Sequence, residues 1–174
     1  MNRSMRYFLH LFINIRKQGF IKNMKNGKNG SGLTFEKCLK KDLDNCPFPD
    51  FDGIEIKVRN QYSKFKLHLA CVEPDFLFAT YSLNEKYGYQ PKEKDLRYFY
   101  LEADAIQKSR YLKHYFQLYV DELTEKIFLL VFDSDFNLVS NEIFWSFEAI
   151  KSRFLIKLNT LAVINCRAKT IDNE

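Results

Sequence analysis

The chain has 174 residues, which is enough for one domain with a sizeable core, and 46% of its residues are hydrophobic. With only six Gly and four Pro, this composition excludes a largely disordered or fibrous protein. The net charge of +5 is uneven, because residues 1–40 carry nine Lys or Arg against the single acid Glu36. A basic segment of this kind can lie against phosphates, and it is also typical of a solvated chain end.

The first twenty-two residues contain an apolar run, Tyr7–Ile15, that follows Arg3 and Arg6. Polar residues interrupt this run, no small-x-small cleavage site follows it, and it is too short to span a bilayer. We interpret residues 1–22 as a basic segment with an amphipathic helix, or as an extension from an upstream start codon. No other stretch approaches transmembrane length, so we expect a soluble, cytoplasmic protein that makes no membrane contact.

The cysteines lie far apart and form no C-x-x-C pair, and no histidine cluster accompanies them. This spacing argues against a zinc site and favours structural thiols in a reducing compartment. The four residues are Cys38, Cys46, Cys71 and Cys166.

Residues 23–32 form a Gly- and Asn-rich loop that leads into a predicted helix over residues 34–43, with Ser31 or Thr34 near its start. The Asn-Cys-Pro turn at residues 45–47 ends this helix, because Pro disfavours helical backbone at the residue before it. A β-branched run at residues 54–58 then predicts a strand.

The remainder of the chain predicts mostly strands. A strand over residues 62–71 and a short helix over residues 77–86 come first. Further strands are expected near residues 97–102, 113–121, 126–132 and 136–140, with turns at residues 121–124 and 133–135. Ser146 is a plausible N-cap for a helix over residues 147–158 with an inward apolar stripe, and residues 161–165 form a short, buried closing strand.

The most informative pattern is a carboxylate, Asp50, just ahead of a strand that carries Glu55 and Lys57. Side chains alternate along a strand, so Glu55 and Lys57 share one face and the apolar residues share the other. Two acids and a lysine in this arrangement suit metal-dependent phosphodiester hydrolysis, since hard oxygens bind Mg²⁺ and the lysine orients water. A half-exposed strand paired with its neighbours would show the same spacing.

The sequence around this pattern distinguishes the two interpretations. Residues 27–36 read Gly-Lys-Asn-Gly-Ser-Gly-Leu-Thr-Phe-Glu, Asp44-Asn45 follows, and residues 49–57 read Pro-Asp-Phe-Asp-Gly-Ile-Glu-Ile-Lys. A second block comprises Val-Phe-Asp at 131–133, Ile-Phe-Trp-Ser-Phe at 143–147 and Leu-Ala-Val-Ile at 161–164. In order and separation these blocks resemble the MvaI/BcnI restriction endonuclease family over most of residues 19–174.

The resemblance implies an α/β fold of the PD-(D/E)XK restriction-endonuclease type, a central mixed β-sheet flanked by helices, with residues 23–174 as the catalytic domain. It also implies Mg²⁺-dependent cleavage of double-stranded DNA. Asp50, Glu55 and Lys57 become the catalytic set, with Glu36 as an auxiliary acid. Asp50, Glu55 and the main-chain carbonyl of Ile56 become the metal ligands.

Asp52 is a rival for the role of Asp50, although Asp50 directly follows the Pro as the family's acid does. Leu33 stands where the family commonly has Lys, so a phosphate contact from that position is missing. The candidate DNA contacts from the basic segment and the loop after it are Lys22, Lys25 and Lys28.

Members of the family continue past the position of Glu174, and that later segment helps to build the DNA-reading lobe, which we expect this chain to lack. The alternative function is therefore a truncated, non-catalytic remnant or an accessory DNA-binding domain on the same fold. A nicking enzyme similar to MutH would place its first acid at Phe48, which favours the restriction branch. We expect a monomer, with a DNA methyltransferase encoded nearby as a functional partner.

Overall fold

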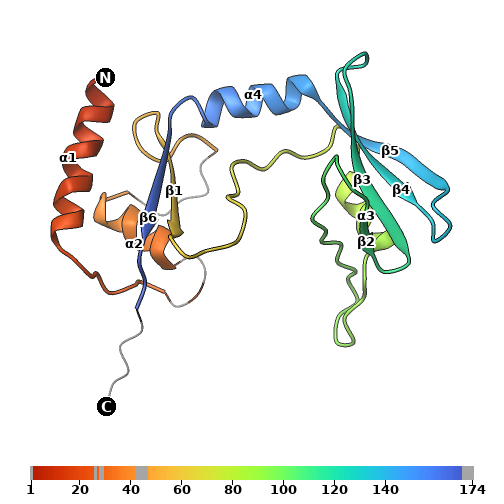
Figure 1. Cartoon of the computed structure of the whole chain (residues 1–174), viewed down its shortest axis with the longest axis horizontal. Helices are drawn as coiled ribbons and strands as arrows, with labels where there is room; N and C mark the ends of the chain where they lie inside the picture. The colour runs from red at the N-terminus through yellow and green to blue at the C-terminus, as the bar shows by residue number, and fades with distance from the viewer. Residues whose placement is uncertain (1, 26, 28–29, 42–46, 170–174) are drawn as a thin grey trace. The chain divides into compact units, whose positions relative to one another are not determined.

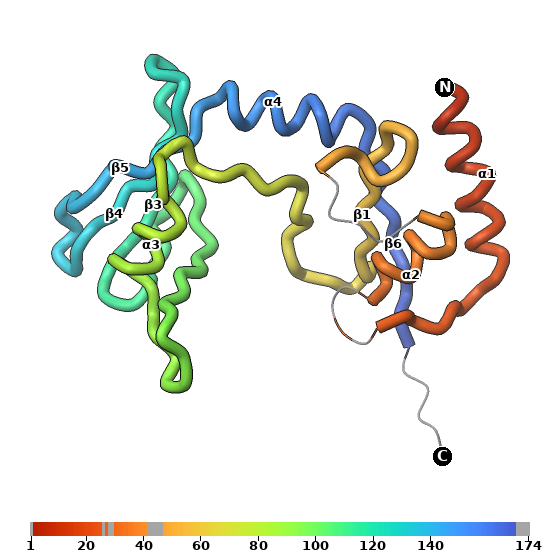
Figure 2. Tube along the Cα trace, turned by 180° about the vertical axis from the view of Figure 1, so that it is seen from behind, coloured from red at the N-terminus to blue at the C-terminus, as the bar shows by residue number. Residues whose placement is uncertain are grey.

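The computed structural model describes residues 2–25, 27, 30–41 and 47–169 (Figure 1). The chain divides into two compact units, here called unit 1 and unit 2. Unit 1 comprises Met1–Ala70 and Arg153–Glu174, and unit 2 comprises Cys71–Ser152. Unit 2 is therefore an insertion between two parts of unit 1, and the tube in Figure 2 follows the chain out after β1 and back along α4.

Unit 1 is built around a two-stranded parallel sheet. Strand β1 (Glu55–Asn60) pairs with β6 (Leu161–Cys166), and Glu55 lies opposite Leu161. The helices of this unit are α1 (Arg3–Lys17), α2 (Gly30–Cys38) and the last residues of α4 (Phe147–Lys157). Two strands bury little area by themselves, so the helices must supply most of the apolar surface that covers the sheet.

Helix α1 confirms the amphipathic helix predicted near the N-terminus. It begins after Asn2, whose side chain accepts a hydrogen bond from the Met5 amide at 2.8 Å and so caps the first turn. Phe8 and Ile15 are its buried residues, and they join Phe35 of α2 and Ile56 of β1 in one apolar cluster. The basic N-terminal helix thus contributes directly to the core beneath β1.

Helix α2 begins and ends earlier than the sequence predicted. Its first residue is Gly30, where a Cβ atom would lie only 2.1 Å from the Lys25 carbonyl oxygen, so the close approach of the loop requires glycine. Its end is a Schellman motif, in which the Lys41 amide donates to Glu36 and the Lys40 amide donates to Lys37. Lys40 has φ +58°, which stops the helix before the predicted turn at residues 45–47. Residues 42–46 of that stretch lie outside the described part of the chain.

Unit 2 is a four-stranded antiparallel sheet in sequential order, covered by helix α3 (Ala79–Tyr87). The strands are β2 (Ser109–Tyr111), β3 (His114–Asp121), β4 (Lys126–Phe132) and β5 (Leu138–Ser146). Phe116 and Val131 are almost completely buried at its centre, where Ala79 and Leu83 of α3 pack against them. The Trp145 indole donates to the Val72 carbonyl at 2.9 Å, which fastens the incoming segment to the sheet.

Several predictions about unit 2 are confirmed. Helix α3 and strands β3 and β4 lie within one or two residues of their predicted bounds. Asp121 and Asp133 form the predicted turns, since the side chain of each accepts backbone amides two to four residues later. The Ser146 hydroxyl accepts from the Ala149 amide at 3.2 Å and caps α4, as predicted.

Other predictions were wrong. Residues 62–71 and 97–102 form no strand, because their main-chain groups find no sheet partner in the described residues apart from an isolated bridge between Tyr98 and Tyr89. Strand β2 was missed, and β5 extends to Ser146. The predicted inward stripe of α4 is not buried, and β6 is half exposed because one neighbouring strand and few side chains cover it.

The α/β class is confirmed, and both parallel and antiparallel strand pairs are present. They are divided between two sheets, whereas the sequence predicted one central mixed sheet. Across the described ranges, no helix combines the length and the apolar character needed to cross a membrane. Cys38, Cys71 and Cys166 are free thiols, and Cys46 falls outside the described residues.

Candidate active site

A tight turn brings Asp50 back against the strand that follows it. Phe51 and Ile54 exchange two main-chain hydrogen bonds of 2.9 Å and 2.7 Å, which leaves a two-residue turn between them. The turn residues Asp52 and Gly53 both have positive φ, +43° and +81°, as a type I′ turn requires. Asp-Gly is a preferred pair for this turn, so the local sequence itself specifies the reversal.

Asp50 lies beside the main chain of β1. Its Oδ2 accepts a hydrogen bond from the Ile56 amide at 2.9 Å, and its Oδ1 lies 3.0 Å from the Lys41 ammonium. The amide of the preceding residue, Glu55, donates instead to Thr160 beside β6 at 2.8 Å. Successive residues of a strand point their main-chain groups to opposite edges, so the Ile56 carbonyl shares the Asp50 edge.

This geometry separates the two rival acids. Asp50 is half-buried and contacts β1, whereas Asp52 is exposed at the tip of the turn. Asp52 is therefore explained by the turn that it forms. Of the two acids, Asp50 is the one that lies against β1, and its catalytic role stays a prediction.

Glu55 is the most unusual side chain of the molecule, because it is charged and has 0% exposure. Its Oε1 lies 2.6 Å from the Lys57 ammonium and 3.5 Å from the Lys157 ammonium. Both contacts are ion pairs, and neither carboxylate oxygen has a hydrogen-bond partner within the described residues. A buried carboxylate is costly unless it is paired, and the two lysines supply that compensation.

Lys157 is a member of the site that sequence reasoning missed. It lies in the last turn of α4, and its side chain is 17% exposed. Arg153, one turn earlier, donates from Nη1 to the Pro47 carbonyl at 3.3 Å, just ahead of Asp50. The spacing of four residues indicates that both cations share one face of a helix, but nothing in the sequence connects that face to Glu55.

The remaining predicted site residues are Glu36 and the three lysines proposed to contact DNA. Glu36 is half-buried near the end of α2, and no three His, Cys, Asp or Glu side chains of the described residues gather closely enough to bind a metal ion. Glu36 therefore does not complete a three-acid cluster with Asp50 and Glu55. Lys22 and Lys25 are exposed, and Lys28 lies outside the described residues.

The site fits a divalent cation in its donor set. Glu55 presents two buried oxygens without a hydrogen-bond donor, and the Asp50 carboxylate and the Ile56 carbonyl lie at the adjoining strand edge. These are hard oxygen donors of the kind that Mg²⁺ binds, one or two carboxylates with positions left for water.

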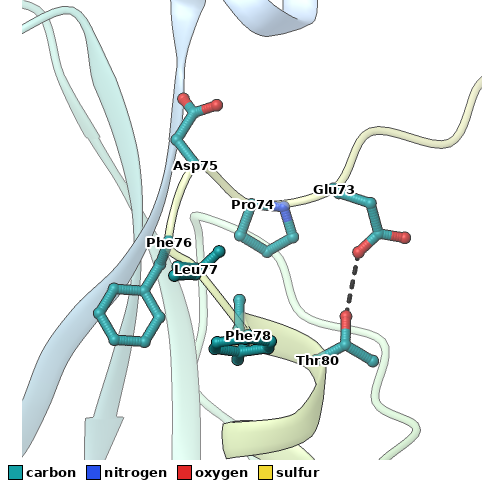
Figure 3. Close-up of a pocket in the computed structure, with 8 residues that line it drawn as sticks. Glu73, Pro74, Asp75, Phe76, Leu77, Phe78 and Thr80 are labelled. Carbon is teal, nitrogen blue, oxygen red and sulfur yellow. Dashed lines mark hydrogen bonds between the residues drawn. The ribbon is translucent and has the colours of Figure 1, made fainter.

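A separate surface pocket lies in unit 2 and is lined by one continuous segment, residues 73–80 (Figure 3). Glu73 accepts from the Thr80 hydroxyl at 3.0 Å, and Asp75 accepts from the Ser146 amide at 2.6 Å. The hydrogen bonds from Ser146 hold the pKa of Asp75 below its usual value. Each of these acids is explained by a local structural contact, so this pocket carries no comparable chemistry.

The α/β fold, with Asp50 ahead of a strand that carries Glu55 and Lys57, is the combination expected of a nuclease of the restriction-endonuclease class. A model of the MvaI/BcnI restriction endonuclease family matches residues 9–174, and the chain belongs to this family. It is a type II restriction endonuclease-like nuclease.

Solved structures similar to the chain include two of restriction endonuclease MvaI. The first, a restriction endonuclease MvaI–cognate DNA substrate complex, is 26% identical, with a TM-score of 0.94 over 99% of this chain and 70% of the other. The second, restriction endonuclease MvaI in the absence of DNA, is 25% identical, with a TM-score of 0.59 over the same shares. A search of curated proteins finds no match.

Proposed function

We propose that the chain is a Mg²⁺-dependent endonuclease that hydrolyses phosphodiester bonds of double-stranded DNA, with Asp50, Glu55 and Lys57 at its centre. The observation that carries this proposal is the buried Glu55 carboxylate, in contact with Lys57 and without a hydrogen-bond donor in the described residues. Burial of a charge at a strand end is destabilising, and it is typical of sites where the charge has a chemical task.

Each residue has a distinct role in this proposal. Asp50, Glu55 and the Ile56 carbonyl hold the cation, which when bound stabilises charge on the phosphate and lowers the pKa of water. Lys57 Nζ lies 2.6 Å from Glu55 Oε1, so its ammonium is held next to the carboxylate that would bind the cation and can orient the attacking water. We retain Glu36 as an auxiliary acid that acts from α2.

The charge of unit 1 supports a nucleic-acid substrate. Unit 1 has 18 Lys and Arg against 8 Asp and Glu, while unit 2 has 9 against 14. The net charges are therefore +10 and −5, and the candidate active site belongs to the basic unit. Lysines on such a surface attract phosphates independently of base sequence, and we include Lys22, Lys25 and Lys28 among them.

The similar structure in complex with its cognate DNA substrate supports the same substrate for this chain. We further propose a monomer, with a methyltransferase encoded nearby that would protect host DNA from the nuclease. The division into residues 1–22 and a catalytic domain over residues 23–174 stays a prediction.

The test is cleavage of supercoiled plasmid in Mg²⁺ by the wild-type chain and by Lys57→Ala, with EDTA as the metal control. Lys86→Ala is a matched variant, because Lys86 also pairs with a glutamate, Glu142, but on the exposed surface of unit 2. We expect nicking or linearisation that requires both metal and Lys57 and that Lys86→Ala retains. Absence of cleavage by folded wild-type protein in every divalent metal tested would replace this proposal with the non-catalytic remnant.

A further inference from the structure

Helix α4 directs two cations at the candidate active site from far along the chain. Arg153 and Lys157 are four residues apart and therefore lie on one face of the helix. Arg153 Nη1 contacts the Pro47 carbonyl at 3.3 Å, and Lys157 Nζ lies 3.5 Å from Glu55 Oε1. Both residues belong to unit 1, as do the groups that they contact.

One carboxylate at this site is in contact with two ammonium groups. Glu55 Oε1 lies 2.6 Å from the Lys57 ammonium and 3.5 Å from the Lys157 ammonium. Like charges around one buried oxygen repel each other, so the site is electrostatically prepared for a further anion.

Arg153 supplies a second, independent observation. Its Nε is buried and lacks a hydrogen-bond partner within the described residues, although Nη1 is occupied by Pro47. A buried donor without an acceptor is costly, and native structures satisfy nearly all such groups. A guanidinium with Nη1 engaged and Nε unsatisfied keeps donors for an acceptor that the described residues do not supply, and a phosphate oxygen is an acceptor that arginine binds well.

We propose that Arg153 and Lys157 bind the non-bridging oxygens of the phosphate that is cleaved, an inference that rests on the proposed nuclease function. Lys157 is the more loosely held partner of Glu55, at 3.5 Å against 2.6 Å for Lys57. Its long, flexible side chain can therefore exchange the carboxylate for a phosphate oxygen while Lys57 stays beside Glu55. Negative charge that develops on the phosphate during attack is then met by the cations of Arg153 and Lys157.

The experiment compares four variants with the wild-type chain. Lys157→Met and Arg153→Met remove the charge but keep an apolar stem that packs against the helix. Lys157→Arg keeps the positive charge. Lys151→Met is the matched control, because Lys151 is an exposed lysine of the same helix that points to another face.

The first measurement is binding of a short DNA duplex in EDTA over a range of salt concentrations. Each lost phosphate contact makes the slope of log K against log salt shallower by about one. We expect this change for Lys157→Met and Arg153→Met, with near wild-type slopes for Lys157→Arg and Lys151→Met. Slopes equal to the wild type for both charge-removing variants, or the same loss for Lys151→Met, would overturn the assignment.

The second measurement is Mg²⁺ binding by calorimetry without DNA. Removal of one positive charge beside Glu55 should tighten Mg²⁺ binding by about tenfold in Lys157→Met, since the like-charge repulsion falls. A merely structural role for Lys157 would weaken metal binding or leave it unchanged. Weaker or unchanged Mg²⁺ affinity in a folded Lys157→Met variant therefore contradicts the proposal.

Single-turnover cleavage at saturating protein separates this inference from the proposed function. We expect a loss of about 10²-fold in the cleavage rate for Lys157→Met and for Arg153→Met. If the variants change the salt slope as predicted but the wild-type protein cleaves no DNA, the phosphate site is supported and the nuclease activity is refuted. If the wild-type protein is active and its variants bind and cleave normally, the nuclease activity is supported and the phosphate site is refuted.

Discussion

Unit 1 and unit 2 differ in whether a glutamate that pairs with lysine is buried or exposed. In unit 2 the core is apolar, and its ion pair Lys86–Glu142 is more than half exposed on both sides. In unit 1 a glutamate is completely buried beneath two lysines, next to an apolar core that includes Ile54 and Ile56. A stable fold does not require a buried glutamate at this position, which agrees with the chemical role that we propose for Glu55.

The largest difference in cleavage rate is expected when glutamate is replaced by glutamine in the ion pair of each unit. Glu55→Gln should lower the cleavage rate by about 10⁴-fold, because it removes the charge that holds cation and lysine together. Glu142→Gln should leave cleavage unchanged within about twofold, since an exposed pair contributes little. Plasmid cleavage measures both effects, with thermal melting to confirm folding. Equal activity of the two variants would contradict the assignment of the site to unit 1.

The second prediction concerns stability and the independence of the units. Phe116 has 0% exposure in the core of unit 2, and Phe116→Ala should destabilise that unit by about 3–5 kcal/mol through the cavity left behind. Hydrogen exchange should then show faster exchange in β3 and β4 than in β1. Uniform loss of protection across β1, β3 and β4 would indicate that the two units unfold as one.

A smaller effect is expected from surface charge. The double substitution Lys22→Ala and Lys25→Ala should reduce DNA affinity at moderate salt and make the log K–log salt slope shallower by about one to two. The matched double substitution in acidic unit 2 is Lys92→Ala and Lys94→Ala. If the unit 2 pair produces the larger loss, the comparison of net charge between the units does not predict where DNA binds.

The smallest effect is a pH-dependent contribution of Asp75, in unit 2, to the free energy of unfolding. Hydrogen bonds from Ser146 lower the pKa of Asp75 from its usual 3.8, so the folded state favours the ionised carboxylate. This contribution is fully present above pH 3.8 and is lost as pH falls through the lower folded-state pKa. Asp75→Asn should therefore cost about 1 kcal/mol or less at neutral pH. Unfolding curves should show this cost shrink below pH 3.8, and a deficit that grows in acid would refute the assignment.

Some of the site could be predicted from sequence because its determinants are local. The Asp52-Gly53 pair specifies the turn, and strand alternation places Glu55 and Lys57 on one face. The burial of Glu55 could not be predicted, because the same spacing suits a solvated strand. Its 0% exposure depends on elements that approach from elsewhere in the chain.

The errors in secondary structure have the same origin. Residues 62–71 alternate like a strand, but a strand requires a hydrogen-bonded neighbour, and no sheet partner is present for them among the described residues. Helix α2 ends at a Schellman motif with Lys40 in the left-handed region, a conformation that most sequences assign to Gly or Asn. Local pattern therefore predicted the type of most elements and the bounds of several, such as β3 and β4, but not which segments find a strand partner or where α2 begins and ends.

By itself the sequence determined the turn before β1, the Glu55–Lys57 face, the amphipathic helix at the N-terminus and the resemblance to a nuclease family. Only the tertiary structure decided that Lys157 contacts Glu55 and that Arg153 contacts Pro47. The parallel pairing of Glu55 with Leu161 returns the chain to β1 after an intervening unit, and α4 arrives just before that return. Contacts between residues so far apart in sequence depend on how the whole chain packs, so local propensity does not predict them.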